Sequence, residues 1–215
     1  MSEAVKRETA KPSAPGQART RLARRAVVDA ARTLFLDRGY VATTIDAVSE
    51  HADVPAPTVY RLFSSKLGIL KALLDVSIAG DDQSLTVQER PDIATLFKER
   101  DAHKLLAGFA AVTTAINQRT NDIYRMLISA AGSDPAAADL LSELRQQRDQ
   151  GQGQIARALV RTKGLKAGMR ERDAADIIHT LMSPEVYRLF VGDRGWTPAR
   201  YQEWLTTTLV QQLAK

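Results

Sequence analysis

Apolar residues recur at intervals of three and four positions through most of the chain, starting near residue 19. That spacing places apolar side chains on one face of an α-helix, which can then pack against other helices. Most of the breaks between the helical segments contain glycine or proline. We therefore predict an all-α protein, with helices at residues 19–38, 43–52, 56–63, 65–79, 92–98, 101–131, 134–163, 173–192 and 197–214.

The first predicted helix ends at Gly39, a residue type that commonly terminates helices. Residues 1–18 before it have no apolar period and contain two prolines, one glycine and two serines, so we predict a disordered basic arm. The inner face of the helix is formed by Leu22, Val27, Ala30, Ala31, Leu34 and Phe35.

Residues 43–63 hold two short helical patterns separated by a four-residue break. Thr43, with Asp46 three residues later, resembles a capping box, so we expect Thr43 to begin the first of these helices. In the break, Asp53 tolerates a left-handed backbone, and Pro55 disfavours helical geometry in the residue before it. This arrangement is typical of a helix-turn-helix that reads DNA.

The second helix of the pair has two distinct faces. Val59, Leu62 and Phe63 form the inner stripe. The outer face offers small residues that allow close approach to a duplex, and hydroxyl and guanidinium groups that bond bases or phosphates. This outer set is Ala56, Pro57, Thr58, Tyr60 and Arg61. Lys66 follows near a predicted helix start, where a phosphate is favoured.

This motif, followed by T-V-Y, F and S-K at the start of another helix, resembles the tetracycline-repressor (TetR) family over roughly residues 20–80. The resemblance implies an all-helical dimer whose N-terminal helices bind DNA and whose larger C-terminal domain binds a small molecule. It also implies phosphate contacts from Thr43, Thr44, Tyr60 and Lys66, and base contacts from Ala56, Pro57, Thr58 and Arg61. Two residues depart from the family pattern: Asp53 stands where glycine is usual, and Pro55 where serine is frequent.

The excess positive charge lies in the same region. Residues 1–71 carry 12 basic and 7 acidic residues, and the remaining 18 of each sign balance in residues 72–215. Arg24 and Arg25, near the start of the first helix, are candidates to lie along a phosphate backbone. A solvated basic face is the alternative interpretation.

We divide the chain into the arm at 1–18, a DNA-binding domain at 19–80 and a C-terminal helical domain at 81–215. Broad apolar stripes on the last two predicted helices suit a four-helix dimer interface, although they could instead complete the monomer core. A helix restart is expected near Ser183, because Pro184 removes a backbone hydrogen bond. The interface candidates are Ile178, Leu181, Tyr187, Trp204, Leu205 and Leu209.

A ligand pocket in the C-terminal domain follows from the resemblance. Aromatic, methionine and polar side chains could line it, although each also suits ordinary core or surface, and His179 suits a structural histidine. The candidates are Phe109, Asn117, Tyr124, Met126, His179 and Met182.

Other kinds of function have little support. The chain has no cysteine, and His51, His103 and His179 lack metal-ligand spacing, so we expect no metal site and no cofactor. The string GQGQIA at residues 151–156 fits a dinucleotide fingerprint, but no buried strand precedes it. We find no serine elbow, P-loop, apolar membrane span or signal peptide, so we expect a cytoplasmic protein that is not an enzyme.

The expected function is that of a bacterial, sequence-specific transcription regulator. By the resemblance, a homodimer would bind an inverted-repeat DNA operator and act as a repressor that a small-molecule effector releases. The alternative is a helical small-molecule-binding or interaction protein that has lost DNA reading.

Overall fold

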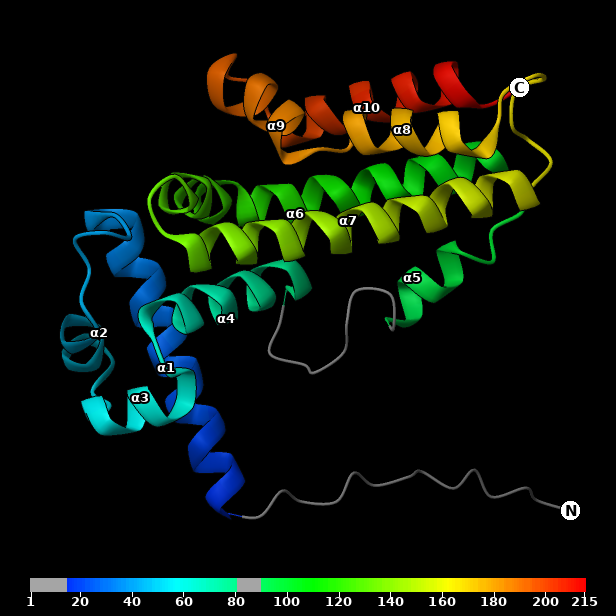
Figure 1. Cartoon of the computed structure of the whole chain (residues 1–215). Helices are drawn as coiled ribbons and strands as arrows, with labels where there is room; N and C mark the ends of the chain where they lie inside the picture. Colours follow the sequence, from blue (N-terminus) through cyan, green and yellow to red (C-terminus); the bar gives the residue numbers. More distant parts are fainter. Residues whose placement is uncertain (1–14, 81–89) are drawn as a thin grey trace, which may run out of the picture.

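The computed structural model describes residues 15–80 and 90–215 and is all-helical (Figure 1). In these ranges there is no β-strand, only one isolated bridge between Leu165 and Ala214. The helices are α1 (Pro15–Arg38), α2 (Ile45–Ala52), α3 (Ala56–Phe63), α4 (Lys66–Ala79), α5 (Pro91–Leu96), α6 (Ala102–Ala131), α7 (Pro135–Arg161), α8 (Glu171–Leu181), α9 (Pro184–Tyr187), a π-helical turn η2 (Arg188–Asp193) and α10 (Pro198–Leu213).

The two long helices α6 and α7 lie side by side through the middle of the molecule (Figure 1). Helices α8, α9 and α10 cover one side of this pair, and α4 and α5 lie on the other side. The short helices α2 and α3 pack with α1 at one end, farthest from the C-terminus. This arrangement leaves α2 and α3 open to a partner.

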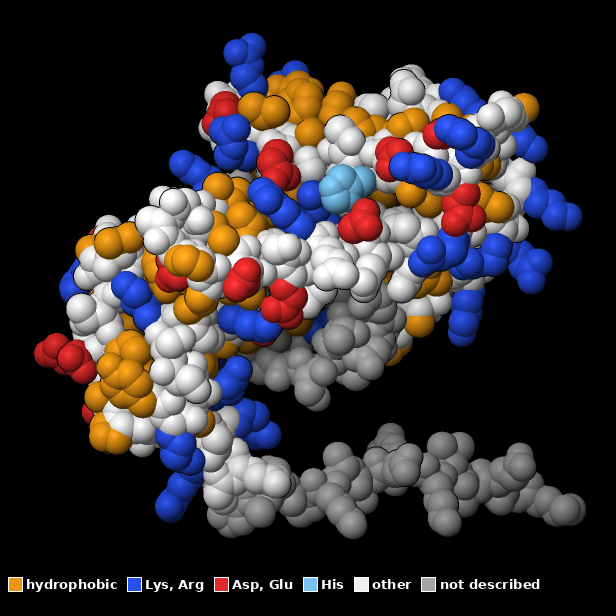
Figure 2. All heavy atoms as spheres, viewed as in Figure 1, with side chains coloured by type: hydrophobic (Ala, Val, Ile, Leu, Met, Phe, Trp, Pro, Cys, Tyr) orange, Lys and Arg blue, Asp and Glu red, His pale blue; other side chains and the backbone are white. Residues whose placement is uncertain are grey.

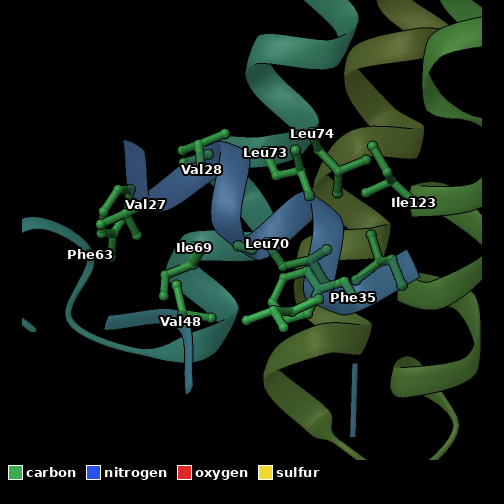
Figure 3. Packing of buried hydrophobic residues seen from close by; sticks show 14 of the residues in the cluster. Val27, Val28, Phe35, Val48, Phe63, Ile69, Leu70, Leu73, Leu74 and Ile123 are labelled. Carbon is green, nitrogen blue, oxygen red and sulfur yellow. The ribbon is translucent and has the colours of Figure 1, made fainter. Parts of the chain in front are cut away.

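Two hydrophobic cores hold the helices together. The first joins α1–α4 to the end of α6 and the start of α7; Phe35, Leu70 and Ile123 meet there (Figure 3). The second joins α5, the start of α6 and the end of α7 to α8, α9 and α10. The first core therefore extends across the domain boundary that we predicted at residue 80.

Most predicted helix ends lie near the observed ones. Gly39 has a φ of 81° and its N–H bonds Phe35 O, which ends α1 as predicted. The chain restarts at α9 with Ser183 as N-cap, because Pro184 stands where α8 would have continued. Helix α7 runs unbroken through the GQGQIA string, so these residues form no dinucleotide-binding turn.

Two features of α1 differ from the prediction. The helix begins at Pro15 and includes residues 15–18 of the predicted arm, because proline is well suited to the first helical turn. The rest of the arm, residues 1–14, lies outside the described residues. Leu22, predicted to face inward, is 66% exposed because this end of α1 extends beyond the first core.

Candidate DNA-binding surface and ligand cavity

The turn between α2 and α3 has the geometry of a helix-turn-helix. Asp53 takes the left-handed conformation, with φ 50° and ψ 42°, and its N–H caps the end of α2 on Glu50 O and Ser49 O. This is the conformation for which glycine is usual and which aspartate tolerates. Pro55 opens α3 without a side-chain cap, because it carries no acceptor oxygen.

Helix α3 turns its apolar face inward and leaves its polar face open. Val59 and Phe63 are buried in the first core. Pro57, Tyr60 and Arg61 are exposed, whereas Ala56 and Thr58 are partly buried. The outer set predicted from the sequence therefore occupies one accessible surface at the N-terminal end of α3. Their contacts with DNA remain a prediction.

Thr43 does not have the role predicted for it. Its side chain is 1% exposed, and its hydroxyl lies 2.8 Å from Gly39 O and 3.3 Å from Leu34 O at the end of α1. The neighbouring Thr44 is the N-cap of α2 and accepts a hydrogen bond from the N–H of Ala47 at 3.1 Å. Thr44 is exposed and available to a phosphate, and Thr43 is not.

Lys66 is also engaged within the protein. Its ammonium donates to the carbonyls of Tyr40, Val41 and Thr43 at 2.8, 3.1 and 2.9 Å. It also lies 4.5 Å from the centre of the Tyr40 ring. Lys66 thus ties the start of α4 to the loop between α1 and α2, and its three donors are already used. The predicted phosphate contact does not fit this geometry.

Arg24 and Arg25 lie on α1, where Figure 2 shows several Lys and Arg side chains on the surface. The guanidinium of Arg24 lies 4.8 Å from the centre of the Phe63 ring and donates to Leu62 O at 3.4 Å. Arg25 lies 3.7 Å from Asp29 in an exposed ion pair. Both arginines also line a cavity. Their contacts with DNA phosphates remain a prediction.

This cavity has a volume of about 890 Å³ and is bounded by residues of α1, α4, α5, α6 and α7 and by the start of α9. Its wall includes four of the six predicted ligand residues, namely Phe109, Asn117, Tyr124 and Met182. A volume of this size suits a small organic molecule. The cavity is therefore the candidate ligand site, and it reaches both the DNA-binding helices and the C-terminal helices.

The other two predicted ligand residues lie outside the cavity wall. Met126 packs against the first core instead, since it lies on a different face of α6 from Asn117 and Tyr124. His179 lies between α8 and α7, where its Nε2 is 3.2 Å from Arg148 Nη2 and its Nδ1 is 3.8 Å from Asp149. His179 is thus a structural histidine, the alternative considered from the sequence.

Two arginines join the DNA-binding helices to the C-terminal helices. The guanidinium of Arg119, on α6, donates to Ser77 O at 2.8 Å and Ile78 O at 3.1 Å, at the end of α4. Arg32, on α1, donates to the Ser77 hydroxyl at 3.2 Å and to Arg119 O at 3.5 Å. Carbonyls at a helix end lack helical partners, so Arg119 acts as a cap for α4.

The predicted dimer interface needs correction. Ile178, Tyr187, Leu205 and Leu209 are at most 3% exposed and belong to the second core of the monomer. They pack inward because α8 and α10 both lie against the α6–α7 pair, and the apolar faces of these helices are buried in that contact. Of the six predicted residues, Leu181 and Trp204 alone keep part of their surface accessible.

Sequence reasoning missed several residues of the cavity and of the helix junction. No local pattern pointed to Arg32 or Arg119, whose partners lie 45 and 42 positions away at Ser77. Arg148 and Gln152 were missed as cavity residues, although they stand one helical turn apart on α7, in line with Leu144. That spacing was the available signal.

The described ranges hold neither a cluster of metal-binding side chains nor a membrane-spanning helix. Residues 15–80 and 90–215 contain no group of three or more His, Cys, Asp or Glu side chains that could hold a metal ion. None of the helices in these ranges is long and apolar enough to cross a membrane.

Comparison with known proteins agrees with this geometry. Residues 27–73 match the family model described as bacterial regulatory proteins, tetR family. YdeS of Bacillus subtilis (strain 168), described as an uncharacterized HTH-type transcriptional regulator, is 28% identical over 179 residues, which cover 82% of each chain.

Two solved structures share the fold. The SmeT–triclosan complex has a TM-score of 0.68 at 15% identity, covering 90% of this chain and 92% of that one. NalD, the secondary repressor of the MexAB-OprM multidrug efflux pump in Pseudomonas aeruginosa, has a TM-score of 0.66 at 19% identity, covering 90% and 97%. YdeS is thus described as a transcriptional regulator and NalD as a repressor. Residues 27–73 therefore resemble the DNA-binding segment of bacterial regulatory proteins of the tetR family, and the chain is a DNA-binding transcriptional regulator.

Proposed function

We propose that this regulator is a homodimeric repressor that binds an inverted-repeat operator and leaves it when a small molecule occupies the cavity. The observation that carries the proposal is the extent of the cavity, whose wall includes residues of α1 and α4 as well as of α6 and α7. A ligand there touches both the DNA-binding helices and the C-terminal helices. SmeT in complex with triclosan and NalD as a repressor support this function by analogy.

The proposed coupling begins where α3 meets α4. A Cβ added to Gly68 would lie 2.0 Å from Phe63 O, so any other residue here would force the two helices to shift apart. The Ser65 hydroxyl accepts from Gly68 N–H at 3.0 Å, and Lys66 fastens the loop before α2. A displacement of α4 would therefore carry α3 with it.

The connection continues from α4 to the C-terminal helices through Arg119 and through an ion pair of 2.9 Å between Lys71 and Glu143 on α7. A ligand shifts the arrangement of these helices only if it binds one arrangement more tightly than another. In this proposal the arrangement with ligand holds two recognition helices at a separation that no longer matches successive major grooves, about 34 Å apart.

At the operator, Ala56, Pro57, Thr58 and Arg61 would face the bases, and Thr44 and Tyr60 the phosphates. The exposed positions of Arg61, Tyr60 and Thr44 support this assignment. The second subunit would pack against the accessible parts of Leu181 and Trp204. Access to bacterial DNA implies that the protein acts in the cytoplasm.

Selection of bound duplexes from a random-sequence pool tests the proposal. The purified protein is used at about 150 mM salt, so that phosphate attraction alone does not dominate. We expect an enriched inverted repeat whose half-sites lie about one helical turn apart. Binding without enrichment, fading as salt rises, would contradict sequence-specific reading and favour a helical binder that no longer reads DNA.

A further inference from the structure

The cavity wall contains two buried amides whose hydrogen bonds are incomplete. Asn117 on α6 is 4% exposed and Gln152 on α7 is 7% exposed, and both line the cavity. Asn117 Nδ2 and Gln152 Oε1 have no hydrogen-bond partner. Buried polar groups are nearly always hydrogen-bonded. Two cavity-lining amides without hydrogen-bond partners therefore indicate a polar partner from outside the chain.

Arg148 adds a cation to the same part of the wall, one helical turn before Gln152. Its side chain is 21% exposed, and its Nε and Nη1 are buried without hydrogen bonds. Only Nη2 has a close polar neighbour, Nε2 of His179 at 3.2 Å, while Glu185 lies 3.7 Å from Nη1. A guanidinium that is buried but incompletely bonded favours a ligand oxygen with negative charge.

Among the described residues of the cavity wall, positive charges outnumber negative ones. In the described ranges, the charged side chains that line the cavity are four arginines and two aspartates, namely Arg21, Arg24, Arg25, Arg148, Asp29 and Asp75. Burial raises the pKa of Asp75, which disfavours its negative charge. The remaining wall is largely apolar, with Val112, Ile116 and Ile155 among its members.

We infer that the effector is an anionic amphiphile, with an apolar body and a carboxylate head held by Arg148 and Asn117. This inference rests on the proposed function and specifies its ligand. Three of the four unmet polar atoms on these cavity-lining residues, Asn117 Nδ2 and Arg148 Nε and Nη1, are donors, which suits an acceptor-rich head group. The apolar wall of α6 and α7 suits the body.

The test uses three probes with the same ten-carbon chain: decanoate, 1-decanol and decyltrimethylammonium. Calorimetric titration of the full chain, below the micellar concentration of each probe, gives their affinities. We expect decanoate to bind about tenfold more tightly than the alcohol, equivalent to ~1.4 kcal/mol, and the cation to bind most weakly. Equal or tighter binding of the alcohol or the cation would overturn the inference.

Variants identify the head-group site. Arg148→Gln and Asn117→Leu should each bring the affinity for decanoate down to that for decanol and leave decanol binding unchanged. Arg145→Gln, which removes an exposed charge from the same helix outside the cavity wall, is the matched control and should behave as the unaltered protein. If Arg148→Gln binds decanoate unchanged, Arg148 does not hold the head group and the inference fails.

Operator release separates this inference from the proposed function. The same probes are added to the complex of the protein with its selected operator. If only the alcohol or the cation releases DNA, the anionic class is wrong and ligand-controlled binding stands. If decanoate binds but neither it nor any molecule of a broad apolar library alters operator affinity, the proposed function fails while the ligand class stands.

Discussion

The substitution Lys66→Met separates an internal structural role for this lysine from a role in DNA binding. Methionine keeps an unbranched apolar chain of similar reach but removes the ammonium group. The variant loses the hydrogen bonds to the carbonyls of Tyr40, Val41 and Thr43, at 2.8, 3.1 and 2.9 Å. The loop between α1 and α2 then keeps the hydrogen bond of the buried Thr43 hydroxyl and the packing of Tyr40 against Phe35.

The size of the effect follows from these contacts. A hydrogen bond to a charged group contributes roughly 1.5–3 kcal/mol net. Two factors reduce the sum: burial lowers the pKa of Lys66, which indicates a desolvation penalty on its charge, and the exposed Val41 carbonyl can bond water instead. We expect a loss of about 2–4 kcal/mol in the free energy of unfolding, or a fall in Tm of roughly 4–16 °C.

Urea denaturation followed by far-UV circular dichroism measures this loss of stability. The salt dependence of operator binding tests the alternative, in which Lys66 contacts a DNA phosphate. Lys71→Met is the control, because its ion pair with Glu143 is about half exposed and should contribute ~0–1 kcal/mol. A Lys66→Met protein of unchanged stability, whose salt slope falls by about one, would refute the structural role and restore the phosphate contact.

Three other substitutions have defined outcomes. Arg61→Ala should weaken specific binding by about 1–3 kcal/mol and relax base preference in each half-site, which repeated duplex selection would detect; an unchanged consensus would exclude Arg61 from base reading. Gly68→Ala should destabilise the protein by ~1–3 kcal/mol, because its Cβ would meet Phe63 O at 2.0 Å. The control Gly16→Ala, whose Cβ would meet nothing within 4 Å, should be neutral or stabilising when both variants are measured by urea denaturation. Arg119→Met should leave operator binding without effector within about tenfold but reduce the ratio of affinities with and without effector; an unchanged ratio would remove Arg119 from the coupling.

The helix-turn-helix was predictable because its signals are local. The left-handed residue Asp53 and the restart at Pro184 follow from backbone preferences that act within a few positions. Backbone preferences within a few positions did not decide whether Thr43 or Thr44 is the N-cap of α2. It depends on how the loop crosses the end of α1, where the carbonyls of Leu34 and Gly39 capture the Thr43 hydroxyl.

Long side chains and broad apolar stripes were the main source of error. A lysine chain can extend in many directions, so its sequence position near a helix start did not reveal that Lys66 reaches back to Tyr40. Periodicity showed that Ile178 and Leu205 face an apolar surface, but it could not say whether that surface belongs to the same subunit. Of the predicted ligand residues, those on one face of α6 line the cavity, and Met126 on another face does not.

The first core has a consequence for how regulators of this kind can exchange their DNA-binding ends. Leu74 of α4 and Ile123 of α6 lie in the same buried cluster (Figure 3), so the cluster spans two segments that are far apart in the sequence. A recombination event near residue 80 would join a foreign set of α1–α4 to an α6–α7 surface shaped for another partner. New operator specificity therefore arises more readily by substitutions on the outer face of α3, which leave this cluster intact, than by swapping whole N-terminal segments.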